Sequence, residues 1–198
     1  MERKARAFCG KPVLATDGPA GTVTDVYFDD ARWSVRYFVV DTGHPMPRRE
    51  VLVAPAHVVP EGPPLRLRLS RIELARCAAA DEDKPVYLQH DMRPLARRGD
   101  PHLRSCGQFA GYEVLALDGV AGRVKDFAVD VERWAVLGLV IDTGRWFMER
   151  ETVVAPLDVQ SIDWLAHQVR VRLRRDALRH RAKLPPSVTP LRPRTTPR

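Results

Sequence analysis

The chain has 198 residues, 44% of them hydrophobic, and a formal net charge of +7 at pH 7. This is enough apolar sequence for a folded core, but no apolar run approaches the roughly 20 residues of a membrane-spanning helix. The basic residues at the start are not followed by an apolar stretch, so a secretory signal is not indicated and we expect a cytoplasmic protein. The three cysteines are isolated, which argues against a disulfide framework and a zinc site (Cys9, Cys77 and Cys106).

The positive charge is concentrated in two segments. Residues 1–83 carry 12 basic and 12 acidic side chains, and residues 111–178 carry 9 and 11. Residues 84–110 carry 5 basic and 2 acidic side chains, and residues 179–198 carry 6 basic and none acidic. The composition therefore predicts near-neutral folded parts and a basic terminal arm.

Four short strands are predicted early in the chain. The apolar run at 12–15 leads into an Asp17-Gly18 turn and a longer alternating segment, which together indicate a β-hairpin. A third strand begins at Trp33 and ends at an Asp-Thr-Gly turn, and "EVLVAP" at 50–55 has the composition of a fourth.

A fifth strand and a helix follow. Aliphatic residues alternate with arginines over 65–69, which places the aliphatic side chains inside and the arginines in water. Ser70 and Glu73 then have the spacing of a capping box, so a short helix is predicted over 71–80.

The same elements return 101 residues later. Residues 10–58 align with 111–159 without a gap and with 24 identities in 49 positions. Beyond residue 160 the register slips by three, because 65–71 matches 169–175 at an offset of 104. The chain is therefore two copies of one module. Its repeated turn positions are Asp17, Gly18, Gly21, Asp118, Gly119 and Gly122.

These patterns predict a mainly β fold of two small duplicated β-barrels, each followed by a short helix. Closure into a barrel removes the edges that such short strands would otherwise expose. The second copy lacks the capping serine, so its helix is less strongly indicated. We expect the following organisation: a first repeat at 1–83, a linker at 84–104, a second repeat at 105–181 and a basic, Pro-rich disordered tail at 182–198.

The two segments "LATDGPAGTVTDVYFDDARWSVRYFVVDTG" and "LALDGVAGRVKDFAVDVERWAVLGLVIDTG", each followed by a Val-Ala-Pro, resemble the PRC-barrel domain. That family includes the cytoplasmic domain of the photosynthetic reaction-centre H subunit and the C-terminal domain of a bacterial ribosome maturation factor. The resemblance covers about 150 residues and implies a six-stranded β-barrel used for contacts rather than catalysis. It brings no catalytic residue and no cofactor.

The titratable residues do not predict an enzyme. The repeated aspartates offer carboxylates for a hard cation such as Ca²⁺, but turn and strand-end roles explain them more simply (Asp17, Asp25, Asp29, Asp41, Asp118, Asp126, Asp130 and Asp142). The six histidines occur singly, and none recurs between the copies. With no nucleophile elbow, P-loop or paired Cys/His spacing, we expect no catalytic residues, no metal and no cofactor.

Large aromatic residues mark a candidate core and a candidate contact surface. Trp33 and Trp134 open the central strand of each copy, where core packing is favoured over ligand stacking. One loop differs between the copies, since "GHPMPRRE" becomes "GRWFMERE". Its three consecutive apolar residues suit either an interface or packing within the domain (Trp146, Phe147 and Met148).

The leading functional hypothesis is a non-catalytic interaction or assembly module that binds a protein partner, not yet identified, or forms a homo-oligomer. One alternative is an accessory factor in ribosome maturation or RNA processing, and another is a component associated with a photosynthetic reaction centre or another membrane electron-transfer complex. The basic tail is a candidate contact for RNA or an anionic membrane, against the simpler interpretation of a solvated tail.

Overall fold

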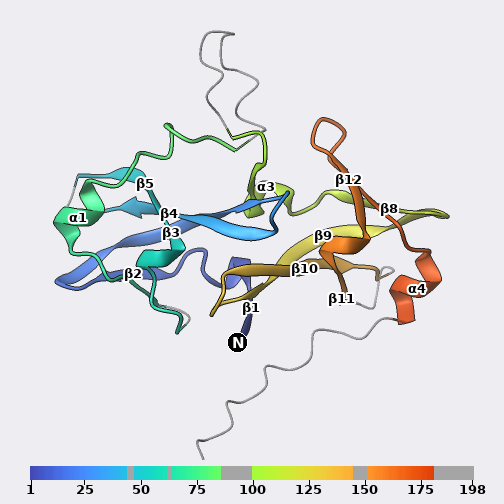
Figure 1. Cartoon of the computed structure of the whole chain (residues 1–198), viewed down its shortest axis with the longest axis horizontal. Helices are drawn as coiled ribbons and strands as arrows, with labels where there is room; N and C mark the ends of the chain where they lie inside the picture. The colour runs from blue at the N-terminus through green and yellow to red at the C-terminus, as the bar shows by residue number, and fades with distance from the viewer. Residues whose placement is uncertain (44–46, 62–63, 86–99, 145–150, 181–198) are drawn as a thin grey trace, which may run out of the picture.

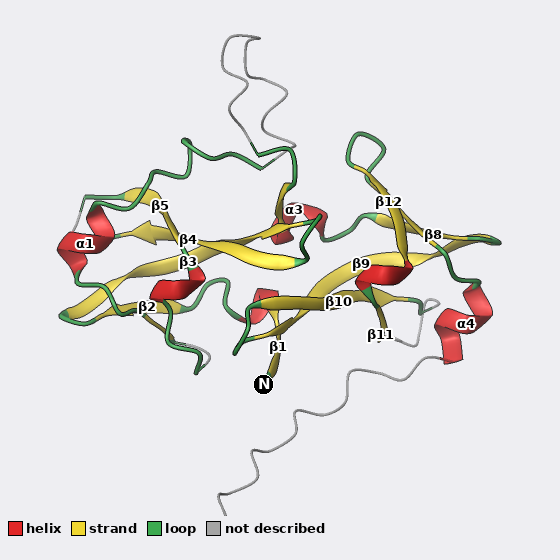
Figure 2. Ribbon diagram, viewed as in Figure 1, coloured by secondary structure: helices red, strands yellow, loops and turns green. Residues whose placement is uncertain are grey.

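The computed structural model is mainly β, with one large mixed sheet and a few short helices (Figures 1 and 2). Within the described residues, no helix is long and apolar enough to cross a membrane. The described residues are 1–43, 47–61, 64–85, 100–144 and 151–180.

Among the described residues, the first half of the chain contributes six strands. They are β1 (Glu2–Lys4), β2 (Pro12–Ala15), β3 (Gly18–Asp29), β4 (Ser34–Thr42), β5 (Arg49–Val53) and β6 (Leu65–Arg66). Its helical turns are η1 (Ala5–Ala7), η2 (Pro55–His57) and α1 (Arg71–Ala75).

The described part of the second half contributes seven strands. They are β7 (Leu103–Ser105), β8 (Glu113–Ala116), β9 (Gly119–Asp130), β10 (Ala135–Asp142), β11 (Glu151–Val154), β12 (Val159–Asp163) and β13 (Gln168–Val171). Its helical turns are α3 (Cys106–Phe109), η4 (Pro156–Asp158) and α4 (Arg175–His180).

The strands expected from the sequence are present in both halves. Residues 34–40 lie in β4 and residues 135–141 in β10, with Trp33 and Trp134 directly before these strands, and neither segment contains a helix. The fifth segment alternates as predicted, because Leu65 and Leu67 are buried while Arg66 is exposed. In the second half the buried Val169 and Val171 of β13 repeat this pattern.

The first helix has the predicted cap but is shorter than predicted. Ser70 accepts a hydrogen bond from the Glu73 N–H while the Glu73 carboxylate accepts one from the Ser70 N–H, which completes the capping box. α1 nevertheless ends at Ala75 rather than residue 80, because the chain that follows extends along the edge of β5. There the Leu52 N–H donates to the Ala78 carbonyl at 2.9 Å.

The two halves pair their strands in matching registers. Val13 of β2 lies opposite Gly21 of β3, and Val114 of β8 lies opposite Gly122 of β9. A Cβ on Gly21 would overlap the backbone carbonyl of Asp41, and both glycines have positive φ angles. A Cβ on Gly122 would meet the equivalent carbonyl of Asp142. The repeated glycines therefore allow the Asp-Thr-Gly segment that ends β4 or β10 to lie close against the neighbouring strand, β3 or β9.

The halves join through their central strands. β4 and β10 pair antiparallel with Ser34 opposite Ala135, and the Val35 N–H donates to the Trp134 carbonyl at 2.8 Å. The Val136 N–H donates to the Trp33 carbonyl at 2.7 Å. One sheet consequently runs through both halves in the order β12-β13-β8-β9-β10-β4-β3-β2-β6, with the first half on the left of Figure 2 and the second on the right.

Candidate functional site

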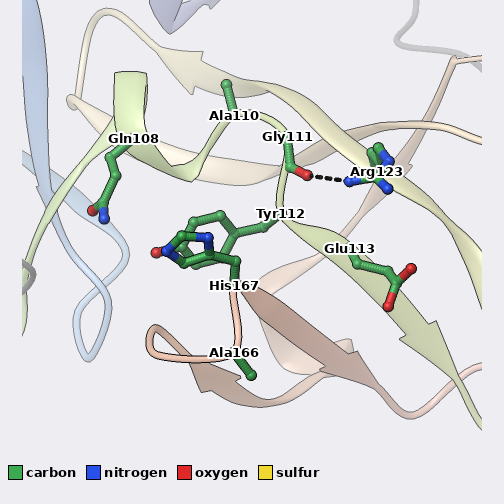
Figure 3. Close-up of a pocket in the computed structure, with 8 residues that line it drawn as sticks. All are labelled: Gln108, Ala110, Gly111, Tyr112, Glu113, Arg123, Ala166 and His167. Atoms are coloured by element: carbon green, nitrogen blue, oxygen red, sulfur yellow. Dashed lines mark hydrogen bonds between the residues drawn. The ribbon is translucent and has the colours of Figure 1, made fainter.

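A pocket of about 480 Å³ opens in the second half beside β8, β9 and the turn between β12 and β13 (Figure 3). Its base is a stack of rings. Phe109 and Tyr112 stack with centroids 4.6 Å apart, and Tyr112 and His167 with centroids 4.9 Å apart. Tyr112 is buried and His167 is exposed, so the imidazole is the outer member of the stack.

Polar groups surround the stack. Arg123 donates from Nη1 to the Gly111 carbonyl at 3.1 Å, as the dashed line in Figure 3 shows. Glu113 accepts from the Gln168 side chain at 3.2 Å, and its N–H donates to the His167 carbonyl at 2.9 Å. These groups offer an aromatic face, a cation and a carboxylate for recognition by hydrogen bonding and stacking.

This polar set belongs to the second copy alone. At the offset of 101 residues, Tyr112, Glu113 and Arg123 correspond to Lys11, Pro12 and Thr22 in the first copy. The backbone frame of the two halves is the same there, but the side chains differ. Comparison of the two copies at these positions was the sequence signal that could have indicated the pocket.

A smaller pocket of about 290 Å³ lies where the halves meet, with Asp30 and Trp33 from the first half on its lining. Asp30 is held from two directions. Arg104 donates from Nε to its carboxylate at 2.6 Å, and His102 Nδ1 lies 2.9 Å from the other oxygen. The Nη1 atom of Arg104 is buried and has no hydrogen-bond partner among the described residues. Because Arg104 and His102 both engage Asp30, the polar groups here tie β7 to the first half.

The two tryptophans occupy equivalent places but different environments. Trp134 is 8% exposed and belongs to the core. Its ring lies 5.1 Å from that of Phe38 and 5.9 Å from that of Phe8, and both phenylalanines belong to the first half. Trp33 is partly buried, with its ring 6.0 Å from that of Phe28. Trp134 thus packs at the junction between the halves.

The repeated turn aspartates, Asp17 and Asp118, each accept a hydrogen bond from a residue of their own half. Asp17 accepts from the Arg71 N–H at 2.9 Å and Asp118 from the Arg175 N–H at 2.8 Å. These backbone hydrogen bonds lower the pKa of both carboxyl groups. Each aspartate therefore fixes the start of the helix that follows the last strand of its half, while Gly18 and Gly119 take positive φ angles in the same turns.

The other repeated aspartates also make local or junction contacts. Asp29 accepts from the Arg32 N–H at 2.8 Å, and Asp130 from the Glu132 N–H at 3.0 Å. Asp142 accepts from the Gly144 N–H at 2.8 Å, and Asp41 forms an ion pair with Arg48 at 3.0 Å. Within the described part of the chain, no three His, Cys, Asp or Glu side chains are grouped so as to hold a metal ion.

Several predicted sites lie outside the described residues. These are the loop residues Trp146, Phe147 and Met148, together with the tail at 182–198 and most of the linker. Leu103 and Arg104, placed in the linker by sequence, are the first two residues of β7.

Sequence reasoning missed a set of exposed apolar side chains in the second half. They are Leu117, Val120, Leu137, Leu157 and Leu165. At the corresponding positions the first copy has Thr16, Pro19, Arg36 and Ala56, while Leu165 lies in the short insertion of the second copy.

A scan against protein-family models finds no match for this chain, and a search of the curated proteins finds none.

Proposed function

We propose that the protein is a non-catalytic interaction or assembly module built from two PRC-barrel-like copies, and that its second copy carries the contact surface. The resemblance of the two repeated segments to that family supports this proposal, as do the matching strand registers of the two halves. In this proposal the duplicated halves are two small barrels, and the partner is a protein or a second copy of this chain.

The observation that carries the proposal is the asymmetry between the copies. Leu137 lies in β10 with 42% of its surface exposed, where the first copy has Arg36. Leu157, at 76% exposure, replaces Ala56. Exposed apolar side chains gain free energy when a partner removes them from water, by about 25 cal/mol per Å². The two copies thus share the same strand pairing but differ in the apolar side chains that they expose to solvent.

The linkage between the halves suits this role. Because β4 and β10 belong to one sheet, a partner held by the second copy has a defined orientation relative to the first. In the sequence, Trp146, Phe147 and Met148 lie between the end of β10, the strand that carries Leu137, and the start of β11.

The test replaces residues of the second copy with those of the first. A tagged chain carrying Leu137→Arg, Trp146→Pro, Phe147→Met and Met148→Pro is compared with the wild type by capture of stoichiometric partners and by light scattering after gel filtration. The matched control is Ile72→Arg, since Ile72 is an apolar residue of the first half with 66% exposure.

We expect the wild type and the Ile72→Arg variant to retain the same partner or oligomeric state, and the second-copy variant to lose it with an unchanged melting temperature. Equal binding by all three proteins would contradict the proposal. So would a wild type that stays monomeric and retains no stoichiometric protein.

A further inference from the structure

The short strands that precede the two copies are exchanged between the halves. β1, which opens the first half, pairs with β9 of the second half, with Lys4 opposite Ala128. β7, which opens the second half, pairs with β3 of the first, with Ser105 opposite Tyr27. Lys4 and Ser105 are 101 residues apart, as are Tyr27 and Ala128, so the two exchanges are equivalent. Each half therefore supplies an edge strand to the other.

Two aspartates, the half-buried Asp25 and the buried Asp126, make equivalent contacts across the junction. Asp25 of the first half accepts from the Gly107 N–H of the second at 3.0 Å and also accepts from the Ser105 hydroxyl. Asp126 of the second half accepts from the Arg6 N–H of the first at 3.1 Å. Gly107 and Arg6 are again 101 residues apart. Each carboxylate thus binds the helical turn that follows the exchanged strand.

The exchanged segments also bring an aromatic ring into the junction. Phe8, directly after η1, has its ring 5.5 Å from Phe38 of its own half and 5.9 Å from Trp134 of the other. Phe109, in α3, has its ring 5.6 Å from Phe127 of its own half and 5.8 Å from Phe28 of the other. Both phenylalanines are 1% exposed and belong to one core cluster that spans the two halves.

Polar contacts close the rim of the junction. Lys4 of the first half donates to both carboxylate oxygens of Glu151 in the second half, at 2.9 and 2.8 Å. Arg104 of the second half in turn donates to Asp30 of the first. The side-chain hydrogen bond from Lys4 lowers the pKa of Glu151. Backbone pairing, hydrogen bonds to carboxylates, aromatic packing and ion pairs consequently all cross the same boundary in both directions.

We propose that the chain is a tethered dimer of one module: the surface between residues 1–85 and 100–180 is an obligate association interface, and its partner is the other copy of the same module. A module without its partner lacks an edge strand, leaves an aspartate carboxylate without the N–H donor that the other half supplies, and exposes a phenylalanine. The interface holds the halves together without the linker.

The experiment cuts the linker of the whole protein after it has folded. A protease site is placed within residues 86–99, the full chain is purified and cleaved under reducing conditions, and the product is analysed by gel filtration at decreasing concentration. We expect the two fragments to elute together and to separate only when denaturant is added. Separate elution under conditions where the uncleaved chain is folded would overturn the proposal.

Paired variants test the exchange itself in the cleaved protein. Asp25→Ala with Asp126→Ala removes the two carboxylates that bind the helical turns α3 and η1 across the junction, whereas Asp17→Ala with Asp118→Ala removes two repeated aspartates that bond within their own halves. We expect the first pair to raise the dissociation constant of the fragments by about tenfold or more and the second pair to leave it unchanged. Single variants are measured if the first pair does not fold. An equal effect of the two pairs would overturn the role assigned to the exchange.

Discussion

Replacing Trp134 with alanine removes the largest side chain at the junction. The ring is 92% buried, and an indole buries roughly 150–250 Å² of apolar surface, so the loss is about 4 kcal/mol of unfolding free energy. The T-shaped contact with Phe38 at 5.1 Å is included in that value. Since the φ angle of Trp134 is 54°, alanine retains the backbone strain, and packing accounts for the entire loss.

Urea unfolding followed by circular dichroism measures the effect. For a chain of this length, about 4 kcal/mol corresponds to a fall of about 12 °C in melting temperature. Trp33→Ala is the matched control, because Trp33 has a φ of 52° but is only partly buried, and it should cost about half as much.

A glycine at the same position separates strain from packing. Trp134→Gly loses the same ring but relieves the positive φ angle, so it should be more stable than Trp134→Ala by about 1 kcal/mol. An alanine variant with the stability of the wild type would refute the burial of Trp134. An alanine variant more stable than the glycine variant would refute its backbone conformation.

Three further predictions concern other parts of the molecule. Gly122→Ala should destabilise the protein by about 3 kcal/mol in urea unfolding, because its Cβ would overlap a backbone carbonyl, whereas Gly43→Ala meets no atom within 4 Å and should be near neutral. Burial raises the pKa of Asp25 and of Asp126, so their contribution to stability is present below the unfolded pKa and is lost as the pH rises through the folded pKa. The stability of the wild type relative to the doubly Asn-substituted variant should therefore fall as the pH rises above about 4, the ordinary pKa of an aspartate, and a rise would contradict the desolvation of these groups. Deleting 182–198 should leave the melting temperature unchanged and abolish low-salt retention on RNA or anionic liposomes, and unchanged retention would leave the tail without a binding role.

The regular strands could be predicted from the sequence because their signals are local. Alternation at 65–69 shows which side chains are buried, and the Ser70–Glu73 spacing shows where a helix begins. The repeat itself predicts that the second copy forms the same strands as the first. The alternation and the cap each depend on residues only a few positions apart, and the repeat is visible from direct comparison of the two segments.

The junction could not be predicted in the same way. The strand Glu2–Lys4 consists of three charged residues, and Leu103–Ser105 has a single apolar residue, so neither has a strand signal of its own. Both become strands because they pair with a long strand of the other half, β9 for Glu2–Lys4 and β3 for Leu103–Ser105. Arg3 and Phe8 also recur 101 residues later, at Arg104 and Phe109, which shows that the repeat includes these segments but not which half they join.

The exposed surface of the second copy also required the structure. Leu137 lies in an apolar run that by sequence is indistinguishable from buried strand, yet it faces outward between the buried Val136 and Gly138. The burial of Asp25 and Asp126 likewise follows from contacts with distant residues and not from their own neighbours in the chain.

The pairing of β4 with β10 is tested most directly by an engineered disulfide. Ser34 and Ala135 form a pair flanked by the two hydrogen bonds between the halves, and in such a non-hydrogen-bonded pair the Cα atoms lie roughly 4.5 Å apart, within the roughly 4.4–6.8 Å range of disulfides. Ser34→Cys with Ala135→Cys is oxidised mildly in the chain with the cleavable linker, with each single variant as a control. After cleavage, we predict that a non-reducing gel shows the two fragments joined in the double variant only, and that reduction separates them. Fragments that remain separate on that gel, with both introduced thiols free, would contradict the shared sheet.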